Sequence, residues 1–525
     1  MVTHEVFNQP PPLVDYNLYE GDRVLREAVA REGAAWAENH LRAFGQRLGS
    51  AEVIEWGVQA NRNPPVLHAF DRYGRRRDTV EFHPAWHHLA SLGVTEGLHT
   101  GPWSDPKPGA HVARAAGVMM LSQIEAGVQC PLTMTYGAVP ALQGQAVAAG
   151  WLPLLFSRRY DGSFQPATRK TGALVGMGMT EKQGGSDVRA TTTRAERDGD
   201  EYRLTGHKWF MSAPMCDAFL VLAQAPGGLS CFFLPRWTPD GRVNAIRLQR
   251  LKDKLGNRSN ASSEAEFEGA TAWIVGEEGR GIPVIIEMAT YTRLDCALGS
   301  SALMRQAVTQ AIHHATHRVA FGKRLVDQPL MTAVLADLAL ESEAATMLAM
   351  RLARAFDHDE VALRRVLTPA AKYWICKRAI HVTGEAMEVL GGNGYVEESP
   401  MPRLYREAPV NSSWEGSGNI MCLDVLRALE RTPESADAIR TEIARARGAD
   451  ARLDAYAERL DTMLAAATEA QARRLAEMIV LALQGALLVR CAPAVVADAF
   501  CATRLSGEPL GADAPAIIAR AHPAV

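Results

Sequence analysis

The chain of 525 residues is long enough for several domains, and its 47% hydrophobic and 22% charged residues are typical of globular proteins in water. A formal net charge of −3 excludes a global positive field that would draw the whole chain to nucleic acid. The start, MVTHEVFNQPPPL, resembles no signal peptide, and no run of about 18 apolar residues follows, so we expect a cytoplasmic protein without a membrane partner. The eight cysteines are scattered without a C-x-x-C pair, which indicates reduced thiols and no metal site.

Four regions that differ in composition and in the pattern of apolar residues follow one another along the chain. Residues 1–172 repeat apolar residues at helical spacing, as in REAVAREGAAWAENHLRAFGQRL, and predict a helical domain. Residues 173–288 contain short runs rich in β-branched and aromatic residues between turn-forming stretches, which predicts a β-domain. Residues 289–431 return to long, Ala-rich amphipathic segments and predict a helical bundle. Residues 432–525, opened by Pro433, predict an extra helical domain, so the order favours an α+β protein.

The first stretch suited to ligand binding is GMGMTEKQGGSDV, which follows an apolar, strand-like run. Its glycines leave backbone N–H groups accessible, and Thr180 and Ser186 add hydroxyls that suit a flat heteroaromatic ring or a phosphate. A glycine-rich turn between domains is the alternative interpretation. The second stretch, GHKWFMS, predicts a strand in which Phe210 and Ser212 share one face, and core packing of the aromatic ring is the alternative.

Three further stretches lie in the second helical region. RVAFGKRLVDQPLM places Arg318 between two long helices, where it could hold a phosphate with two N–H groups or remain a solvated charge. EAMEVLGGNGY predicts a helix that ends in a glycine-rich turn. WEGSGNIMCLDVL places Glu415 where a helix should begin. Its carboxylate is either a catalytic group or a charge that the helix dipole stabilises by about 0.3–1 kcal/mol.

In this order and domain sequence, the five stretches resemble the acyl-CoA dehydrogenase family. The resemblance covers residues 1–430 and implies that family's α+β fold, with an N-terminal helical domain, a middle β-domain and a C-terminal four-helix bundle. It also implies that FAD binds between the β-domain and the bundle, and that the R-x-x-F-G…Q segment reaches the FAD of a neighbouring subunit. The positions that it assigns to FAD binding are Met179, Thr180, Gly185, Ser186, Phe210, Met211, Ser212, Arg318, Phe321, Gln328, Gly392, Asn393, Trp414, Gly416, Ser417 and Asn419.

The same resemblance places Glu415 on the general base that removes the α-proton of an acyl thioester, while hydride passes to the flavin. The chemistry explains the residue type, because a carboxylate desolvated beside an aromatic wall such as Trp414 is a stronger base than one in water. Some members carry their base on another helix, where this chain has Thr292 and Arg293, so Glu415 is the candidate. The candidates for substrate contact are Ser186, Arg293 and Trp414.

The stretches HEVFNQPPPL and LQRLKDKLGNRSNASSEAEF, with the extra C-terminal domain, resemble a narrower group of that family, the alkylation-response flavoproteins of bacteria. This implies a homotetramer that contains FAD, binds double-stranded DNA through its C-terminal domain and has at most weak dehydrogenase activity. Residues 432–525 hold ten arginines, no lysine and twelve acids, so a salt-bridged helix surface is the alternative. The candidates for DNA contact are Arg440, Arg445, Arg447, Arg473 and Arg474.

Three functions remain open from the sequence. The first is a DNA-binding flavoprotein that protects DNA from alkylation and acts on an acyl-CoA or an alkylated substrate. The second is a catabolic dehydrogenase of short or branched acyl-CoA. The third is a non-catalytic DNA-binding regulator that keeps FAD as a structural part.

Overall fold

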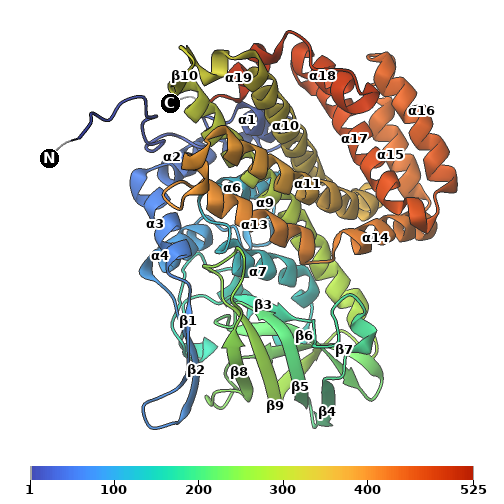
Figure 1. Cartoon of the computed structure of the whole chain (residues 1–525). Coiled ribbons are helices and arrows are strands. Elements are labelled where there is room, and N and C mark those ends of the chain that lie inside the picture. Colours follow the sequence, from blue (N-terminus) through green and yellow to red (C-terminus); the bar gives the residue numbers. More distant parts are fainter. Residues whose placement is uncertain (1–2, 524–525) are drawn as a thin grey trace. The chain divides into compact units, whose positions relative to one another are not determined.

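The computed structural model describes residues 3–523, which divide into two compact units (Figure 1). The helical unit consists of Met1–Ile54, Pro108–Gln123 and Cys296–Val525, and the sheet unit consists of Glu55–Lys107 and Ile124–Asp295. Both units combine segments from several of the predicted regions. The predicted domain borders at residues 172, 288 and 431 therefore stay predictions.

The sheet unit contains a seven-stranded sheet of strand order β3-β5-β4-β6-β7-β9-β8, so the predicted β-domain is confirmed. Most neighbours pair antiparallel, and β3 pairs parallel with β6. Strands β6 and β7 are buried on both faces for most of their length, which explains their continuous apolar runs AFLVLA and CFFLP. The strands are β3 (Val175–Gly178), β4 (Arg194–Asp198), β5 (Glu201–Ser212), β6 (Ala218–Ala225), β7 (Gly228–Pro235), β8 (Ile246–Leu251) and β9 (Ser262–Val275).

A β-hairpin interrupts the helices expected over residues 1–172. Strands β1 (Val66–Phe70) and β2 (Arg76–Glu81) pair antiparallel, and residues 71–75 form the turn between them. The Asp71 carboxylate accepts hydrogen bonds from two backbone N–H groups of that turn. Such side-chain contacts favour a turn over a helix, so the uniform helical expectation was wrong for this segment.

The remaining elements of the sheet unit are helical. Helix α7 packs against β3, where the buried Thr135 hydroxyl accepts from the Val175 N–H at 3.0 Å and lies 3.3 Å from its carbonyl oxygen. The helices of this unit are α4 (Pro84–Thr95), α5 (Gly101–Ser104), α7 (Gln129–Leu142) and α8 (Leu152–Leu155). Three helices continue from one unit into the other: α3 (Ala51–Arg62), α6 (Ala110–Ile124) and α9 (Gly281–His317).

The helical unit is organised around two long helices that the Ala-rich segments predicted. Helix α10 (Pro329–Asp357) is buried over most of Leu335–Phe356, and its many alanines let neighbouring helices approach closely. Helix α11 (Val361–Val389) packs against α10, α13 and α14. The other helices here are α1 (Arg23–Arg31), α2 (Glu38–Leu48), α13 (Met401–Ser413) and α14 (Gly418–Arg431).

The region after residue 431, here called the C-terminal extension, is also helical, as expected (Figure 1, orange to red). Helix α17 is buried from Leu475 to Leu488 and packs against α10, α11 and α14, which explains its apolar run MIVLALQGALLV. Among the residues that the structure describes, no helix is long and apolar enough to cross a membrane. The extension contains α15 (Glu434–Ala444), α16 (Ala451–Ala466), α17 (Ala472–Cys491), α18 (Ala494–Phe500) and α19 (Ala514–Ala521).

Buried ion pairs join the extension to α10. The guanidinium of Arg351 on α10 donates two hydrogen bonds to Glu442 of α15, at 2.9 and 3.1 Å, and both side chains are less than 5% exposed. Glu341 and Glu343, also on α10, pair with Arg504 and Arg520 of the extension. Because a buried carboxylate is costly without a partner, these contacts make the extension an integral part of the helical unit.

Candidate functional site

The predicted site residues are divided between the two units. The glycine-rich stretch, Phe210, Met211, Ser212 and Arg293 belong to the sheet unit, whereas Glu415 and the remaining candidates belong to the helical unit. Within each unit, several of them share hydrogen bonds with residues that the sequence did not single out.

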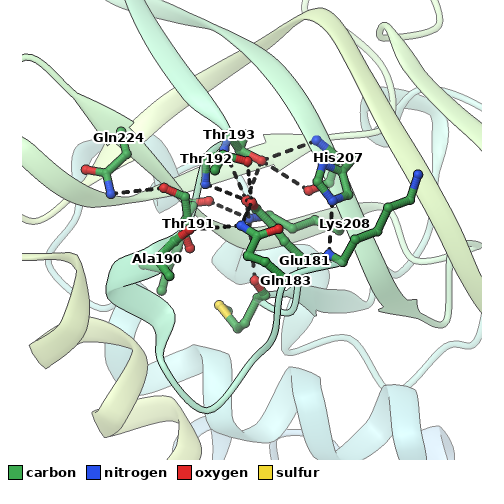
Figure 2. A network of polar contacts seen from close by, with 12 residues as sticks. Glu181, Gln183, Ala190, Thr191, Thr192, Thr193, His207, Lys208 and Gln224 are labelled. Atoms are coloured by element: carbon green, nitrogen blue, oxygen red, sulfur yellow. Dashed lines mark hydrogen bonds and ion pairs between the residues drawn. The ribbon is translucent and has the colours of Figure 1, made fainter.

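In the sheet unit, a buried ion pair lies beneath the glycine-rich stretch (Figure 2). The Nζ of Lys208 on β5 lies 2.8 Å from Oε1 of Glu181, and the two side chains are 0% and 1% exposed. Lys208 also donates to the carbonyl of Leu222, at 2.8 Å, and lies 3.5 Å from that of Met179. Burial opposes ionisation of Glu181, but Lys208 and the hydroxyl of Thr193 outweigh it and lower the pKa of this carboxyl.

The loop that follows β3 is closed by the same carboxylate. Glu181 accepts hydrogen bonds from both the backbone N–H and the hydroxyl of Thr192 and Thr193, at 2.6 to 3.2 Å, and from the amide of Gln183 at 2.7 Å. Figure 2 shows these donors converging from the start of the loop, from its end and from β5. Glu181 therefore fixes both ends of a segment whose middle, residues 182–187, is largely exposed.

The candidate flavin contacts in this loop are partly accessible. Met179 and Thr180 are half-buried, and Ser186 is exposed. The Thr180 carbonyl accepts from the N–H of Trp209, and its side chain lies against Gly185, where an added Cβ would fall 2.2 Å from the Thr180 hydroxyl. A residue without a side chain is therefore needed at position 185.

On β5 the predicted alternation is present. Phe210 is 47% exposed, Met211 is fully buried and Ser212 is half-buried, with its hydroxyl 3.5 Å from that of Ser262. A phenylalanine that is 47% exposed argues against the core-packing alternative, and it lies where the register between β5 and β9 shifts. The ammonium of Lys252 lies 4.7 Å from the centre of the Phe210 ring.

Arg293 and its neighbours lie on the part of α9 that belongs to the sheet unit. Arg293 is buried, at 8% exposure. Nearby on the same helix, the ring of Tyr291 packs edge-on against the rings of Trp103 and Tyr136, at centroid distances of 5.2 and 5.3 Å. Sequence reasoning missed this cluster, because its rings lie far apart along the chain and no spacing connects them.

In the helical unit, Glu415 lies in a tight turn between α13 and α14. Trp414 follows the last residue of α13 and Ser417 precedes the first residue of α14, so Glu415 lies before the first turn of the helix instead of within it. This position disfavours the helix-dipole explanation of its charge. Glu415 has φ +58°, a left-handed conformation that costs a residue with a side chain about 1–3 kcal/mol and that is found at turns and at functional sites.

Neighbouring groups hold this turn in place. Gly416 has φ +107°, a backbone conformation that strains any residue with a side chain and therefore favours glycine. The buried ammonium of Lys372 on α11 donates to the Gly416 carbonyl, and the indole of Trp414 donates to Asn411 at 3.0 Å. Contacts from α11 and α13 therefore hold the turn that contains Glu415.

The R-x-x-F-G…Q segment forms a short hairpin before α10. Strands β10 (Val319–Ala320) and β11 (Lys323–Arg324) flank Phe321, which is 98% exposed at φ +52°. Arg318 donates to the backbone carbonyl of Asn8 at 2.6 Å, and the Gln328 amide donates to the Ala320 carbonyl at 3.0 Å. The ring of Phe321 is therefore almost fully accessible at this turn.

The glycine-rich end of α11 is accessible. Gly392 and Asn393 begin the short helix α12 (Gly392–Tyr395) and are both exposed, and an added Cβ on Gly392 would meet no atom within 4 Å. The preceding Gly391, at φ +60°, ends the long helix as the sequence predicted.

Most of the candidate DNA-binding arginines are engaged within the chain. Arg440 pairs with Asp437 and Asp461, Arg445 with Glu442, and Arg474 with Glu477. Arg473 donates to the Asn419 side chain at 2.8 Å and so joins α17 to the start of α14. Arg447 is exposed, and no carboxylate among residues 3–523 pairs with it. These contacts favour the salt-bridged helix surface.

Three functional candidates escaped the sequence analysis: Glu181, Lys208 and Lys372. Glu181 and Lys208 stand within stretches that the sequence did single out, and this was the usable signal. Lys372 had no such signal, because its partner is a backbone carbonyl 44 residues away.

Three family models match the chain in order. They are the adaptive response protein AidB N-terminal domain over residues 8–162, the acyl-CoA dehydrogenase middle domain over 176–270 and the acyl-CoA dehydrogenase C-terminal domain over 279–430. The chain is 52% identical to AidB of Escherichia coli (strain K12) over 511 residues, which cover 96% of this chain and 94% of that protein.

Two solved structures are similar over nearly the whole chain. Bd2924 in its apo form is 31% identical, with a TM-score of 0.85, and the match covers 93% of this chain and all of that one. ACDH-11 of Caenorhabditis elegans in complex with C11-CoA is 28% identical, with a TM-score of 0.85, and the match covers 99% of this chain and 93% of that one.

Proposed function

Because this chain belongs to the acyl-CoA dehydrogenase family, in the branch of AidB, we propose that it binds FAD and uses Glu415 to remove the α-proton of an acyl-CoA. By its family membership it is an FAD-dependent, acyl-CoA dehydrogenase-like oxidoreductase. The observation that carries the proposal is the turn at Glu415. Glu415 has a left-handed backbone, Lys372 holds the carbonyl of the next residue, and that residue, Gly416, has a φ that favours glycine, so the carboxylate has the features of a positioned base.

The residues present fit a flavin. Phe210 and Phe321 expose aromatic rings, and Gly392 offers bare backbone, so flat rings and a phosphate-containing chain would meet suitable surfaces. When bound, FAD would supply the acceptor for the substrate hydride. The remaining FAD-binding assignments among the sequence candidates, and the substrate contacts at Ser186, Arg293 and Trp414, belong to the same proposal.

In this proposal the residues of the chain itself carry out one step, the removal of the α-proton. The Glu415 carboxylate would accept the α-proton at one of its oxygens, and the bracing of its turn would hold it toward the C–H bond. The side chain of Trp414 would exclude water on one side of this carboxylate, which strengthens it as a base. An acyl-CoA is the substrate class that we favour, since the relative ACDH-11 was solved with C11-CoA.

The experiment that tests this function starts from the purified protein. We expect a visible flavin spectrum that bleaches under anaerobic conditions when a matching acyl-CoA is added. A panel should include short, branched and medium-length chains, because a response restricted to short or branched chains would favour the catabolic alternative. A flavin that stays oxidised with every thioester of the panel would refute the dehydrogenase proposal.

We also propose a homotetramer as the assembly, because the family resemblance implies that the segment around Phe321 reaches a neighbouring subunit, and this side chain is accessible here. The family branch supports a cytoplasmic protein of the alkylation response, either as a flavoenzyme or as a non-catalytic regulator. For both of these, double-stranded DNA is the proposed partner of the extension.

DNA binding by the extension is expected to be weak, because four of its five candidate arginines already have partners. We expect a labelled duplex to be retained at low salt only, with an affinity that falls roughly as the first or second power of the salt concentration. Fluorescence anisotropy across a salt series measures this slope. Arg447→Ala should weaken retention and the paired Arg440→Ala should change it less, whereas no binding at low salt would remove the DNA proposal.

A further inference from the structure

The ion pair of Glu181 and Lys208 has no assigned role, although it is the most enclosed pair of charges near any candidate site residue. Both side chains are at most 1% exposed. A buried ion pair is in general weak evidence for stability, because removing two charges from water costs about as much as their attraction returns. The role of the pair therefore has to be inferred from the hydrogen-bond donors around Glu181.

Those donors come from three separate stretches of the chain. Gln183 lies at the start of the loop, Thr192 and Thr193 lie at its end, and Lys208 lies on β5 (Figure 2). The two carboxylate oxygens accept three hydrogen bonds each: Oε1 from Lys208 and twice from Thr193, and Oε2 from Gln183 and twice from Thr192. A carboxylate used in this way fixes the distance between the loop's two ends.

Other contacts continue the same network into the loop. The Gln183 amide also donates to the Ala190 carbonyl at 2.9 Å, and the Lys182 N–H donates to the His207 ring at 3.0 Å. On the other side, Lys208 reaches the carbonyls of Leu222 and Met179. The ion pair between Lys208 and Glu181 therefore helps to set the positions of Met179 and Thr180, the candidate flavin contacts.

We infer that Glu181 and Lys208 are positioning residues, which together hold the loop of residues 179–193 in the conformation that receives the cofactor. This inference rests on the proposed function for the identity of the cofactor. The conformation of the loop itself does not depend on that function. A neutral, apolar pair of similar size would fill the same space but would lack the directed donors.

The test compares Lys208→Met with Lys182→Met, a matched control whose side chain lies in the same loop but outside the ion pair. Lys182 is exposed, and its ammonium lies 5.6 Å from the centre of the Trp209 ring without an ion pair among the described residues. We expect Lys208→Met to weaken FAD binding by the reconstituted protein about tenfold or more and to raise amide hydrogen exchange in residues 179–193. Lys182→Met should change neither by more than about twofold.

The double variant Glu181→Gln/Lys208→Met separates positioning from a merely structural role. It removes both charges, so its thermal unfolding midpoint should return toward that of the wild type. The FAD affinity and the visible band shape of the bound flavin should remain altered. Full recovery of both, or a Lys208→Met variant with wild-type exchange in the loop, would overturn the inference. If the wild type binds no FAD, the proposed function fails, and the hydrogen exchange still decides about the loop.

Discussion

Glu415→Gln is expected to slow anaerobic bleaching of the flavin by an acyl-CoA by about 10²- to 10⁴-fold, while the flavin stays bound. The amide has nearly the shape of the carboxylate, so the left-handed turn and its contact with Lys372 should persist. What is lost is the ability to accept a proton. Stopped-flow visible absorbance measures the rate, and the unchanged spectrum before mixing reports that the cofactor remains.

Glu430→Gln is a matched control for this substitution. Glu430 lies near the other end of α14 and is exposed, so its amide should leave the bleaching rate within about twofold of the wild type. A Glu415→Gln protein that bleaches at the wild-type rate would show that the base lies elsewhere. If protection from alkylation in cells also survives Glu415→Gln with FAD bound, the non-catalytic alternative gains support.

Arg351→Met is expected to lower the free energy of unfolding of the helical unit by roughly 3 kcal/mol. The substitution removes the guanidinium that donates two hydrogen bonds to Glu442, whose side chain is 4% exposed. Removing one partner of a buried ion pair costs about 3–5 kcal/mol of stability. Arg445 and Arg490, at 3.2 and 3.4 Å, retain some compensation, which places the expected value at the low end. Thermal and urea unfolding midpoints measure the loss.

The pH dependence of this loss has a definite sign. Burial raises the pKa of Glu442, but the hydrogen bonds and charge of Arg351 outweigh it, so the pKa lies below its ordinary value of 4.5. A depressed carboxyl pKa adds stability that is present above the ordinary value and is lost as the pH falls below it. The difference between wild type and Arg351→Met should therefore shrink from pH 7 to below about pH 4.5.

Two further variants check the cause. Arg354→Met removes a partly exposed guanidinium that lies 3.9 Å from Glu32, and it should cost less than about 1 kcal/mol. Arg351→Met/Glu442→Leu removes both buried charges and should recover most of the lost stability. A double variant as unstable as Arg351→Met alone would contradict the ion-pair explanation.

The sequence predicted the helical and β regions because hydrophobic periodicity and turn residues act locally. It also predicted the end of α11 at Gly391 and a shared face for Phe210 and Ser212, which follow from glycine chemistry and strand alternation, but it did not predict that Phe210 is exposed. The β1–β2 hairpin was missed because its strands are short and half-exposed, so that their alternation is weak beside the surrounding helices.

Contacts between residues far apart in the chain could not be predicted from the sequence, for a different reason. Glu181 meets Thr193 and Lys208 only after the loop folds back, and Arg473 meets Asn419 across 54 residues. Arg473 and Asn419 were predicted for DNA and for FAD respectively, yet their side chains bind one another. Charge and residue type alone do not determine which of several distant partners a polar group will find.

The pairing of α10 with the C-terminal extension bears on how this protein can be dissected. A fragment that ends near residue 431, the length that the acyl-CoA dehydrogenase models cover, would retain Glu341, Glu343 and Arg351 but lose Arg504, Arg520 and Glu442. It would also uncover the apolar side chains on α10 and α11 that α17 now covers. The proposed catalytic and DNA-binding activities therefore cannot be assigned by cutting the chain in two, and point substitutions in the whole chain are the appropriate means to separate them.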